Sequence, residues 1–258
     1  MIVYRDFLKA RLGNQLFFVA STMGIAKRNN TTYSFSSDLG HSGLDYKMLF
    51  EHSIPKTNYV PEKKYHQEGY GYYDVDITDD VELIGYFQSE KFFKNCENEV
   101  RHQFKFKKEI VDSVLNQYPE ITKSASLHIR RGDYVNQPNH HPLMPLEYYN
   151  EFLNNHKDEY DKIFVFTDDI DWAKETYQGE KYIFPYFNEN NDLYSFVLLS
   201  QSKTTVIANS TYSWWAAWLN DNKDKKIYCP PHNKWFGSMY NSLETKDILP
   251  KEWNIINF

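Results

Sequence analysis

Two adjacent arginines follow an apolar run in the segment Leu127–Val135, which reads L-H-I-R-R-G-D-Y-V. Leu127 and Ile129 alternate with His128 and Arg130. This period of two predicts a strand with the apolar pair on one face and the polar pair on the other. The sequence therefore places cationic side chains at the end of a buried strand, where their chemistry suits the binding of an anion.

A diphosphate is the anion that these side chains fit best. A guanidinium donates two parallel hydrogen bonds to phosphate oxygens and stays charged at any working pH, so Arg130 and Arg131 can take one phosphate each. Gly132 permits a tight turn, and Asp133 is close enough in sequence to hold one guanidinium. Two alternatives are a structural arginine–aspartate network and an adhesive R-G-D loop, but an adhesive loop should be exposed rather than follow an apolar strand.

The segment His128–Tyr134 resembles the signature of the α-1,2-fucosyltransferases, the inverting enzymes of glycosyltransferase family eleven. Further segments resemble that family in the same order: Leu12–Phe17 (L-G-N-Q-L-F), Gly85–Glu90 (G-Y-F-Q-S-E), Phe164–Asp169 (F-V-F-T-D-D) and Ala208–Leu219 (A-N-S-T-Y-S-W-W-A-A-W-L). Their joint occurrence spans most of the chain. The resemblance implies a GT-B-like α/β fold with two Rossmann-like lobes, the C-terminal one binding the nucleotide sugar on a parallel sheet.

The resemblance also implies a reaction: transfer of L-fucose from GDP-β-L-fucose to the 2-hydroxyl of a galactoside, with inversion and without a metal or other cofactor. The acceptor would be a galactose-terminated oligosaccharide, free or lipid-linked. The catalytic residues implied are Arg130, Arg131 and Asp133. The residues implied to bind the nucleotide sugar are His128, Arg130, Asp168, Asp169, Asn209, Ser210, Thr211, Arg11, Asn14 and Gln15.

The C-terminal half alternates short apolar runs with amphipathic stretches, which predicts a parallel sheet with helices on both faces. The expected strands are Ala125–Arg130, Lys162–Phe166 and Thr205–Ala208, and the expected helices are Glu109–Asn116, Leu146–Asn155, Asp171–Tyr177 and Tyr212–Leu219. Ligands of such sheets gather at the carboxyl ends of the strands. The three late family-like segments all fall at such ends.

Polar residues at two of these strand ends have a second interpretation. Asp168 or Asp169 could accept hydrogen bonds from guanine or ribose, or could instead cap the following helix. Asn209, Ser210 and Thr211 could bind a phosphate through their hydroxyls and backbone amides, or could form an ordinary helix cap, and both can hold together. Trp214 and Trp218 are one helical turn apart, and such a stripe is typical of a core.

The N-terminal half is less regular. It predicts a strand over Ile2–Leu8, a turn at Gly13, a helix over Asn14–Lys27 and a strand over Val81–Tyr86, with irregular loops between Thr31 and Val81 that could shape an acceptor pocket. The segment Tyr118–Glu120 is the natural boundary. We therefore expect residues 1–120 to form an acceptor-side lobe and residues 121–258 a GDP-fucose-binding lobe.

The general base for the acceptor hydroxyl has several candidates, because any carboxylate or imidazole within hydrogen-bond reach would serve. They are Asp133, Glu90, His128 and Asp38, and His41 lies near Asp38 in the same irregular region. The pair His140–His141 is expected to lie in an exposed turn.

Composition limits the remaining possibilities. The 258 residues carry a net charge of -6, which argues against a nucleic-acid partner, and 41% hydrophobic residues suffice for a real core. The only two cysteines predict no disulfide framework, and the charged N-terminus resembles neither a secretory signal nor a membrane span. We expect a bacterial, cytoplasmic enzyme that could contact the inner membrane surface.

Two rival functions fit parts of the sequence. Asp74-Val75-Asp76 and Asp169-Ile170-Asp171 are D-x-D patterns, which would suit a metal-dependent glycosyltransferase using another nucleotide sugar. A non-catalytic carbohydrate-binding protein would explain the 21 tyrosines, but a neutral glycan needs no pair of guanidinium groups.

Overall fold

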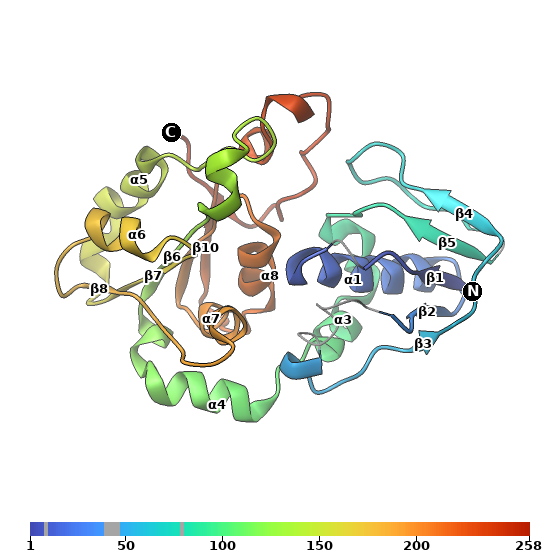
Figure 1. Ribbon diagram of the computed structural model, residues 1–258, viewed down its shortest axis with the longest axis horizontal. Coiled ribbons are helices and arrows are strands. Elements are labelled where there is room, and N and C mark those ends of the chain that lie inside the picture. The colour runs from blue at the N-terminus through green and yellow to red at the C-terminus, as the bar shows by residue number, and fades with distance from the viewer. Residues whose placement is uncertain (8–9, 39–46, 78–79) are drawn as a thin grey trace. The chain divides into compact units, whose positions relative to one another are not determined.

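The computed structural model describes residues 1–7, 10–38, 47–77 and 80–258, and the chain divides into two compact units (Figure 1). Unit 1 comprises Met1–Lys107 with Leu243–Pro250, and unit 2 comprises Lys108–Ser242 with Lys251–Phe258. The division thus differs from the boundary expected at Tyr118–Glu120. Helix α4 (Lys108–Gln117) lies in unit 2 because it packs against helix α7 (Asn191–Leu199). The two helices are distant in the sequence, so a local sequence pattern does not predict this contact.

The segment Leu243–Pro250 is held in unit 1 by one buried carboxylate. Asp247 Oδ2 accepts a hydrogen bond of 3.0 Å from the backbone N–H of Tyr72, and Oδ1 forms an ion pair with Lys91. The lysine and the Tyr72 amide hold the pKa of this acid below its usual range, against the opposing effect of burial. The segment Leu243–Pro250 is therefore anchored to unit 1 by a charge-assisted contact.

Unit 1 contains a five-stranded parallel sheet in the order β3-β2-β1-β5-β4. Its strands are β1 (Ile2–Tyr4), β2 (Tyr33–Ser36), β3 (Lys56–Thr57), β4 (Lys63–His66) and β5 (Val81–Ile84), and its helices include α1 (Leu12–Arg28) and α3 (Glu97–Gln103). Helix α1 packs against β1 and β2, and nearly all of its residues are buried. This all-round burial agrees with its largely apolar sequence.

Three local predictions for unit 1 need correction. Strand β1 ends at Tyr4, short of the expected Leu8, which lies outside the described residues. Gly13 is not a turn before the helix: the backbone is still extended at Arg11 (φ -82°, ψ 170°), and α1 starts at Leu12, so Gly13 belongs to the first helical turn. The stretch from Thr31 to Val81 is also less irregular than expected, since it contains β2, β3 and β4.

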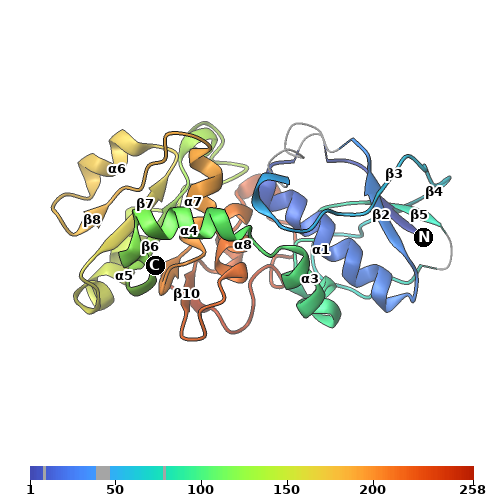
Figure 2. The same ribbon diagram turned by 90° about the horizontal axis from the view of Figure 1, so that it is seen from below.

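Unit 2 contains a six-stranded parallel sheet in the order β11-β10-β9-β6-β7-β8 (Figures 1 and 2). Its strands are β6 (Ala125–Ile129), β7 (Ile163–Thr167), β8 (Tyr182–Ile183), β9 (Thr204–Val206), β10 (Lys226–Cys229) and β11 (Asn254–Ile255). The chain moves outward from β6 to β8, then resumes beside β6 at β9 and moves outward the other way. This is the doubly wound nucleotide-binding order, and its switch point lies between β6 and β9.

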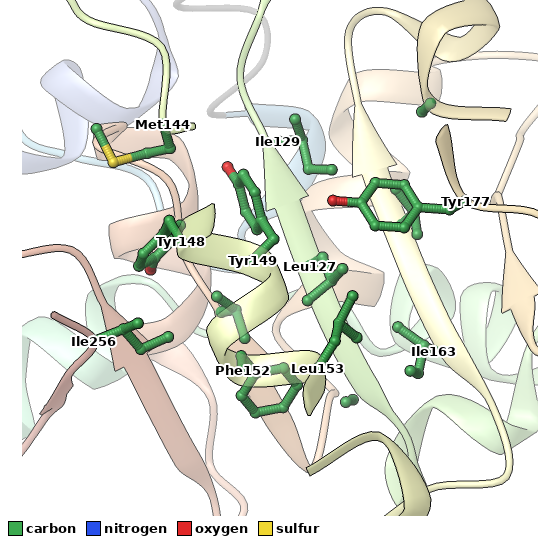
Figure 3. Packing of buried hydrophobic residues seen from close by; sticks show 14 of the residues in the cluster. Leu127, Ile129, Met144, Tyr148, Tyr149, Phe152, Leu153, Ile163, Tyr177 and Ile256 are labelled. Atoms are coloured by element: carbon green, nitrogen blue, oxygen red, sulfur yellow. The ribbon is translucent and has the colours of Figure 1, made fainter. Parts of the chain in front are cut away.

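Helices cover both faces of this sheet, as the sequence predicted. Helices α5 (Leu146–His156) and α6 (Ile170–Thr176) cover the face that carries Leu127 and Ile129, where Tyr149 and Phe152 pack on the strand (Figure 3). The opposite face carries Ser126, whose hydroxyl hydrogen-bonds that of Ser202 at 2.6 Å. Helices α4, α7 and α8 (Thr211–Leu219) pack together in one layer.

The tryptophan stripe of α8 belongs to the core, which confirms that prediction. Trp214 is fully buried and Trp218 nearly so, and their rings stack at 6.3 Å between centroids. Within the residues that the structure describes, no helix has both the length and the apolar character needed to cross a membrane.

Candidate active site

The carboxyl end of β6 brings Arg130 between two acids. Its Nη2 lies 2.5 Å from Asp133 Oδ1, and its Nη1 lies 2.5 Å from Asp168 Oδ2 at the end of β7. The ring of Tyr134 lies below the guanidinium, 5.4 Å from ring centroid to Cζ. Asp133 therefore holds one guanidinium, as its position in the sequence suggested, and that guanidinium belongs to Arg130.

Arg131 is held by a neighbouring loop instead. Its Nε donates to Asp169 Oδ2 at 2.8 Å, and its Cζ lies 4.0 Å from the ring centroid of Trp172. Asp169 is also the N-cap of α6, because its side chain accepts the backbone N–H of Trp172 at 3.4 Å. Helix capping by this acid, the alternative to nucleotide contact, is thus confirmed for Asp169.

Asp168 contacts the turn after β6 through both oxygens. Oδ1 accepts the backbone N–H groups of Arg131 at 2.8 Å and Gly132 at 3.1 Å, and Oδ2 forms the ion pair with Arg130. The side chains of Arg130 and Arg131 are 20% and 22% exposed, so neither guanidinium is closed off from an anion in solution. The ends of two adjacent strands thus hold two ordered, partly exposed arginine side chains, each paired with at least one carboxylate.

His128 lies on the polar face of β6, as predicted, and is buried. Its imidazole stacks on Tyr212 with 5.3 Å between centroids, and its Nδ1 is buried without a hydrogen-bond partner. Burial, reinforced by the charge of Arg130, lowers the pKa of this imidazole to about 3. His128 is therefore neutral at physiological pH and can offer one ring nitrogen as a donor and the other as an acceptor.

This histidine should make stability depend on pH. Above pH 6.5 the imidazole is neutral in both states, but below it only the unfolded chain binds a proton. The free energy of unfolding should therefore fall by up to about 1.4 kcal/mol per pH unit from this one group, between pH 6.5 and pH 3. In urea titrations, the free energy of unfolding of His128→Phe should fall by roughly 2.5 kcal/mol less than that of the parent between pH 7 and pH 4.5. An equal loss in both proteins would contradict the assignment, and the exposed His66→Phe is the control.

The loop after β9 combines a structural side chain with an open helix end. Asn209 is buried and donates to the backbone carbonyls of Pro142 at 2.9 Å and Trp235 at 3.1 Å, so its side chain ties three loops together. Ser210 occupies the N-cap position of α8, but its side chain makes no capping hydrogen bond, and Thr211 begins the helix. An ordinary side-chain cap is therefore wrong for Ser210.

The loops after β6 and β9 meet at the switch point of the sheet. Tyr134 Oη donates to the backbone carbonyl of Asn209 at 3.1 Å, and the stack of His128 on Tyr212 joins β6 to the first turn of α8. The pair Arg130–Arg131 and the N-terminal end of α8 thus occupy the sheet edge where doubly wound folds bind nucleotides.

The three candidate nucleotide-sugar ligands in unit 1, Arg11, Asn14 and Gln15, have different surroundings. Gln15 is buried, and its Nε2 donates to the carbonyls of Phe7 and Ala10 at 3.2 and 3.1 Å, which is a fold role. Asn14 Oδ1 accepts from Gln88 Nε2 at 2.9 Å, and Arg11 is exposed at the N-cap of α1.

The family-like segment Gly85–Glu90 adopts an unusual backbone in unit 1. Phe87 has φ +47°, a left-handed conformation that is rare for a bulky residue, and Gln67 Oε1 accepts the amides of Tyr86 and Phe87 at 2.9 and 2.8 Å. Ser21 Oγ donates to the Phe87 carbonyl at 2.9 Å. Phe87 itself is fully buried, so surrounding contacts hold this strained turn in place.

Comparisons with known proteins show the family of this chain. The family model described as Glycosyl transferase family 11 matches residues 45–257. The chain belongs to glycosyl transferase family 11. It is 32% identical over 206 residues to the O-antigen biosynthesis glycosyltransferase WbnK of Escherichia coli, covering 74% of this chain and 67% of that protein. It is 33% identical to an Escherichia coli α-1,2-colitosyltransferase over 67% of this chain and 61% of that one.

The solved structures establish the fold alone. The NodZ α-1,6-fucosyltransferase, soaked with GDP-fucose, superposes with a TM-score of 0.54 at 14% identity, covering 87% of this chain and 96% of that chain. The GT-B-like α/β fold expected from the sequence is therefore confirmed, with a parallel sheet in each unit.

The candidate general bases of this family 11 protein differ in their surroundings. Glu90 is buried and lies 3.3 Å from Lys94, Asp38 is exposed, and His41 lies outside the described residues. His128 is a weak base because its pKa is low. Asp133, with 41% of its side chain exposed, is the carboxylate that adjoins the arginine pair.

Sequence reasoning missed three aromatic residues of the candidate site: Tyr134 beside Arg130, Trp172 over Arg131, and Tyr212 against His128. Each occurs inside or next to a family-like segment, so the motifs themselves were the available signal. The pair His140–His141 is also less exposed than expected: His141 is half-buried and stacks on Tyr134 at 4.8 Å between centroids.

Proposed function

We propose that this glycosyltransferase transfers L-fucose from GDP-β-L-fucose to the 2-hydroxyl of a terminal galactose, giving an α-linked product. The observation that carries the proposal is the arginine pair at the β6–β9 switch point, which supplies two guanidinium groups for a diphosphate. Membership of family 11 and the relative named for α-1,2 transfer support the donor class and the linkage.

The chemistry is a single in-line displacement. The acceptor 2-hydroxyl oxygen attacks C1 of the sugar, the bond from C1 to the phosphate oxygen breaks, and its electron pair leaves with GDP. Arg130 and Arg131 stabilise the charge that grows on the diphosphate. A carboxylate, for which Asp133 is the candidate in unit 2, takes the proton of the acceptor hydroxyl.

We infer that this reaction needs no divalent metal, because one acid of each D-x-D pattern already contacts a cation. Asp169 pairs with Arg131 at 2.8 Å, and Asp74 lies 3.6 Å from Arg28. Among the described residues, no three histidine, cysteine or acidic side chains gather in a way that suits a metal. The two arginines offer the positive charge that a metal would otherwise bring to the leaving group.

The test combines donor, acceptor and metal in one assay. The enzyme is incubated with GDP-fucose and a panel of β-galactosides, with EDTA or with Mn²⁺, and products are examined by NMR for fucose on the galactose 2-hydroxyl. We expect fucose transfer from GDP-fucose at a rate that EDTA leaves unchanged. Transfer from UDP-galactose alone would overturn the donor, and activity lost in EDTA but restored by Mn²⁺ would overturn metal independence.

The sugar carried by the donor is tested in the same assay. One relative is named for colitose, the 3-deoxy form of fucose, so GDP-colitose belongs beside GDP-fucose. We expect the higher kcat/KM with GDP-fucose. A clear preference for GDP-colitose would replace the sugar in the proposal and leave the nucleotide and the linkage standing.

A further inference from the structure

We propose that Asp168 is a positioning residue that fixes Arg130 for the donor diphosphate and does not read the guanine or ribose. The proposal rests on the function proposed above and assigns a part within it. It starts from the contacts of one carboxylate, which joins the backbone of the turn after β6 to the side chain of Arg130.

The hydrogen bonds of Asp168 leave little capacity for a base. Its Oδ1 accepts two backbone N–H groups, from Arg131 at 2.8 Å and Gly132 at 3.1 Å, which occupies both lone pairs of that oxygen. Its Oδ2 lies 2.5 Å from Arg130 Nη1. A guanine edge presents two neighbouring N–H donors that need both oxygens of one carboxylate, so base reading would require Asp168 to release the turn.

These bonds also allow Asp168 to set the orientation of the Arg130 guanidinium. The two amides fix the carboxylate relative to the backbone of the turn after β6, and the carboxylate in turn fixes one edge of the guanidinium. Because a planar guanidinium binds phosphate with a defined direction, a small rotation of Arg130 would misalign its parallel donors. Asp168 therefore acts on the diphosphate through Arg130.

Gly132 supports this assignment independently. A Cβ atom added there would lie 2.4 Å from Asp168 Oδ2, closer than any real contact of a Cβ, although the backbone of Gly132 does not adopt a left-handed conformation that demands glycine. The absent side chain leaves the space that the carboxylate occupies. Glycine at this position thus serves the approach of Asp168 to Arg130.

The experiment compares two ligands that differ only in the diphosphate. Binding of GDP and of guanosine is measured for the parent, Asp168→Asn and Gly132→Ala, by calorimetry and ligand-observed NMR. In Asp168→Asn the amide oxygen can still accept the two backbone N–H groups, but the charge beside Arg130 is lost. We expect GDP binding to weaken at least about tenfold while guanosine binding stays within about twofold.

Gly132→Ala should give the same pattern by displacing the carboxylate, and it carries the test by itself if Asp168→Asn fails to fold. Because both changes act through one contact, the double variant should weaken GDP binding little more than either single variant. Glu175→Gln, which removes an exposed charge from helix α6 just after Asp168, is the matched control and should bind both ligands like the parent.

Three results would overturn either the role of Asp168 or the proposed function, and they can be distinguished from one another. Equal losses of GDP and guanosine binding would make Asp168 a reader of the nucleoside, and an unchanged affinity for GDP would remove its positioning role. A parent enzyme that binds no GDP would instead overturn the proposed function, and this inference with it.

Discussion

Replacement of Arg130 by alanine should lower kcat by about a hundred- to a thousandfold, the usual cost of losing one preorganised group that stabilises a leaving charge. The fold should survive, because Arg130 is partly exposed and Asp168 keeps its two backbone N–H donors. Arg130→Lys should recover only part of the rate, since an ammonium cannot make two parallel hydrogen bonds. Steady-state kinetics with GDP-fucose and a galactoside acceptor measure the effect.

The matched control for this change is Arg101→Ala, on helix α3 of unit 1. Arg101 pairs with Glu97 on the same helix at 3.1 Å, so its loss should leave kcat near that of the parent. Turnover of Arg130→Ala within a few-fold of the parent would show that this guanidinium does not stabilise the diphosphate. Loss of the melting transition would instead assign Arg130 a role in folding.

Gly24→Ala should be among the most destabilising single-methyl additions in unit 1. A Cβ there would lie 2.1 Å from the carbonyl oxygen of Phe92 and 2.4 Å from Cα of Phe93, and neither backbone atom can yield without moving the segment that packs on α1. Asn95 also donates to the Gly24 carbonyl at 2.9 Å, which marks the same close approach. We expect a loss of roughly 2–4 kcal/mol in the free energy of unfolding.

Urea denaturation followed by circular dichroism measures this loss, with Lys27→Ala on the same helix as the control. Lys27 is half-exposed and pairs with Glu99 at the surface, so its removal should move the midpoint very little. A Gly24→Ala protein as stable as the parent would mean that α1 lies farther from Phe92 and Phe93 than described. The usual effect of alanine for glycine within a helix is a gain of about 0.5–1 kcal/mol, so the sign itself is diagnostic.

The regular elements of unit 2 were largely predictable. The expected strand over Ala125–Arg130 and the expected helices over Leu146–Asn155 and Tyr212–Leu219 match β6, α5 and α8 to within one residue at each end. Their signals are strong because these elements are well buried: α5 buries one face at helical spacing, and β6 and α8 are buried on nearly every side. The site candidates at the ends of β6, β7 and β9 followed from the parallel winding that this alternation implies.

The elements that were not predicted do not bury an apolar face. Strand β4 reads K-K-Y-H and is mostly exposed at the edge of its sheet, so no apolar alternation marks it. Strand β3 has two residues, and helix α3 buries only Val100. Short elements of this kind are stabilised by neighbours that are distant in the sequence, and a local window does not contain those neighbours.

The sequence by itself determined the family, through the order of its motifs, and the period of β6 put His128 and Arg130 on one face. Only the tertiary structure decided the partners, giving Arg130 to Asp133 and Asp168, and Arg131 to Asp169. Local spacing alone allows several such pairings. The choice among them is made by the parallel register of β6 and β7, which brings the two strand ends together.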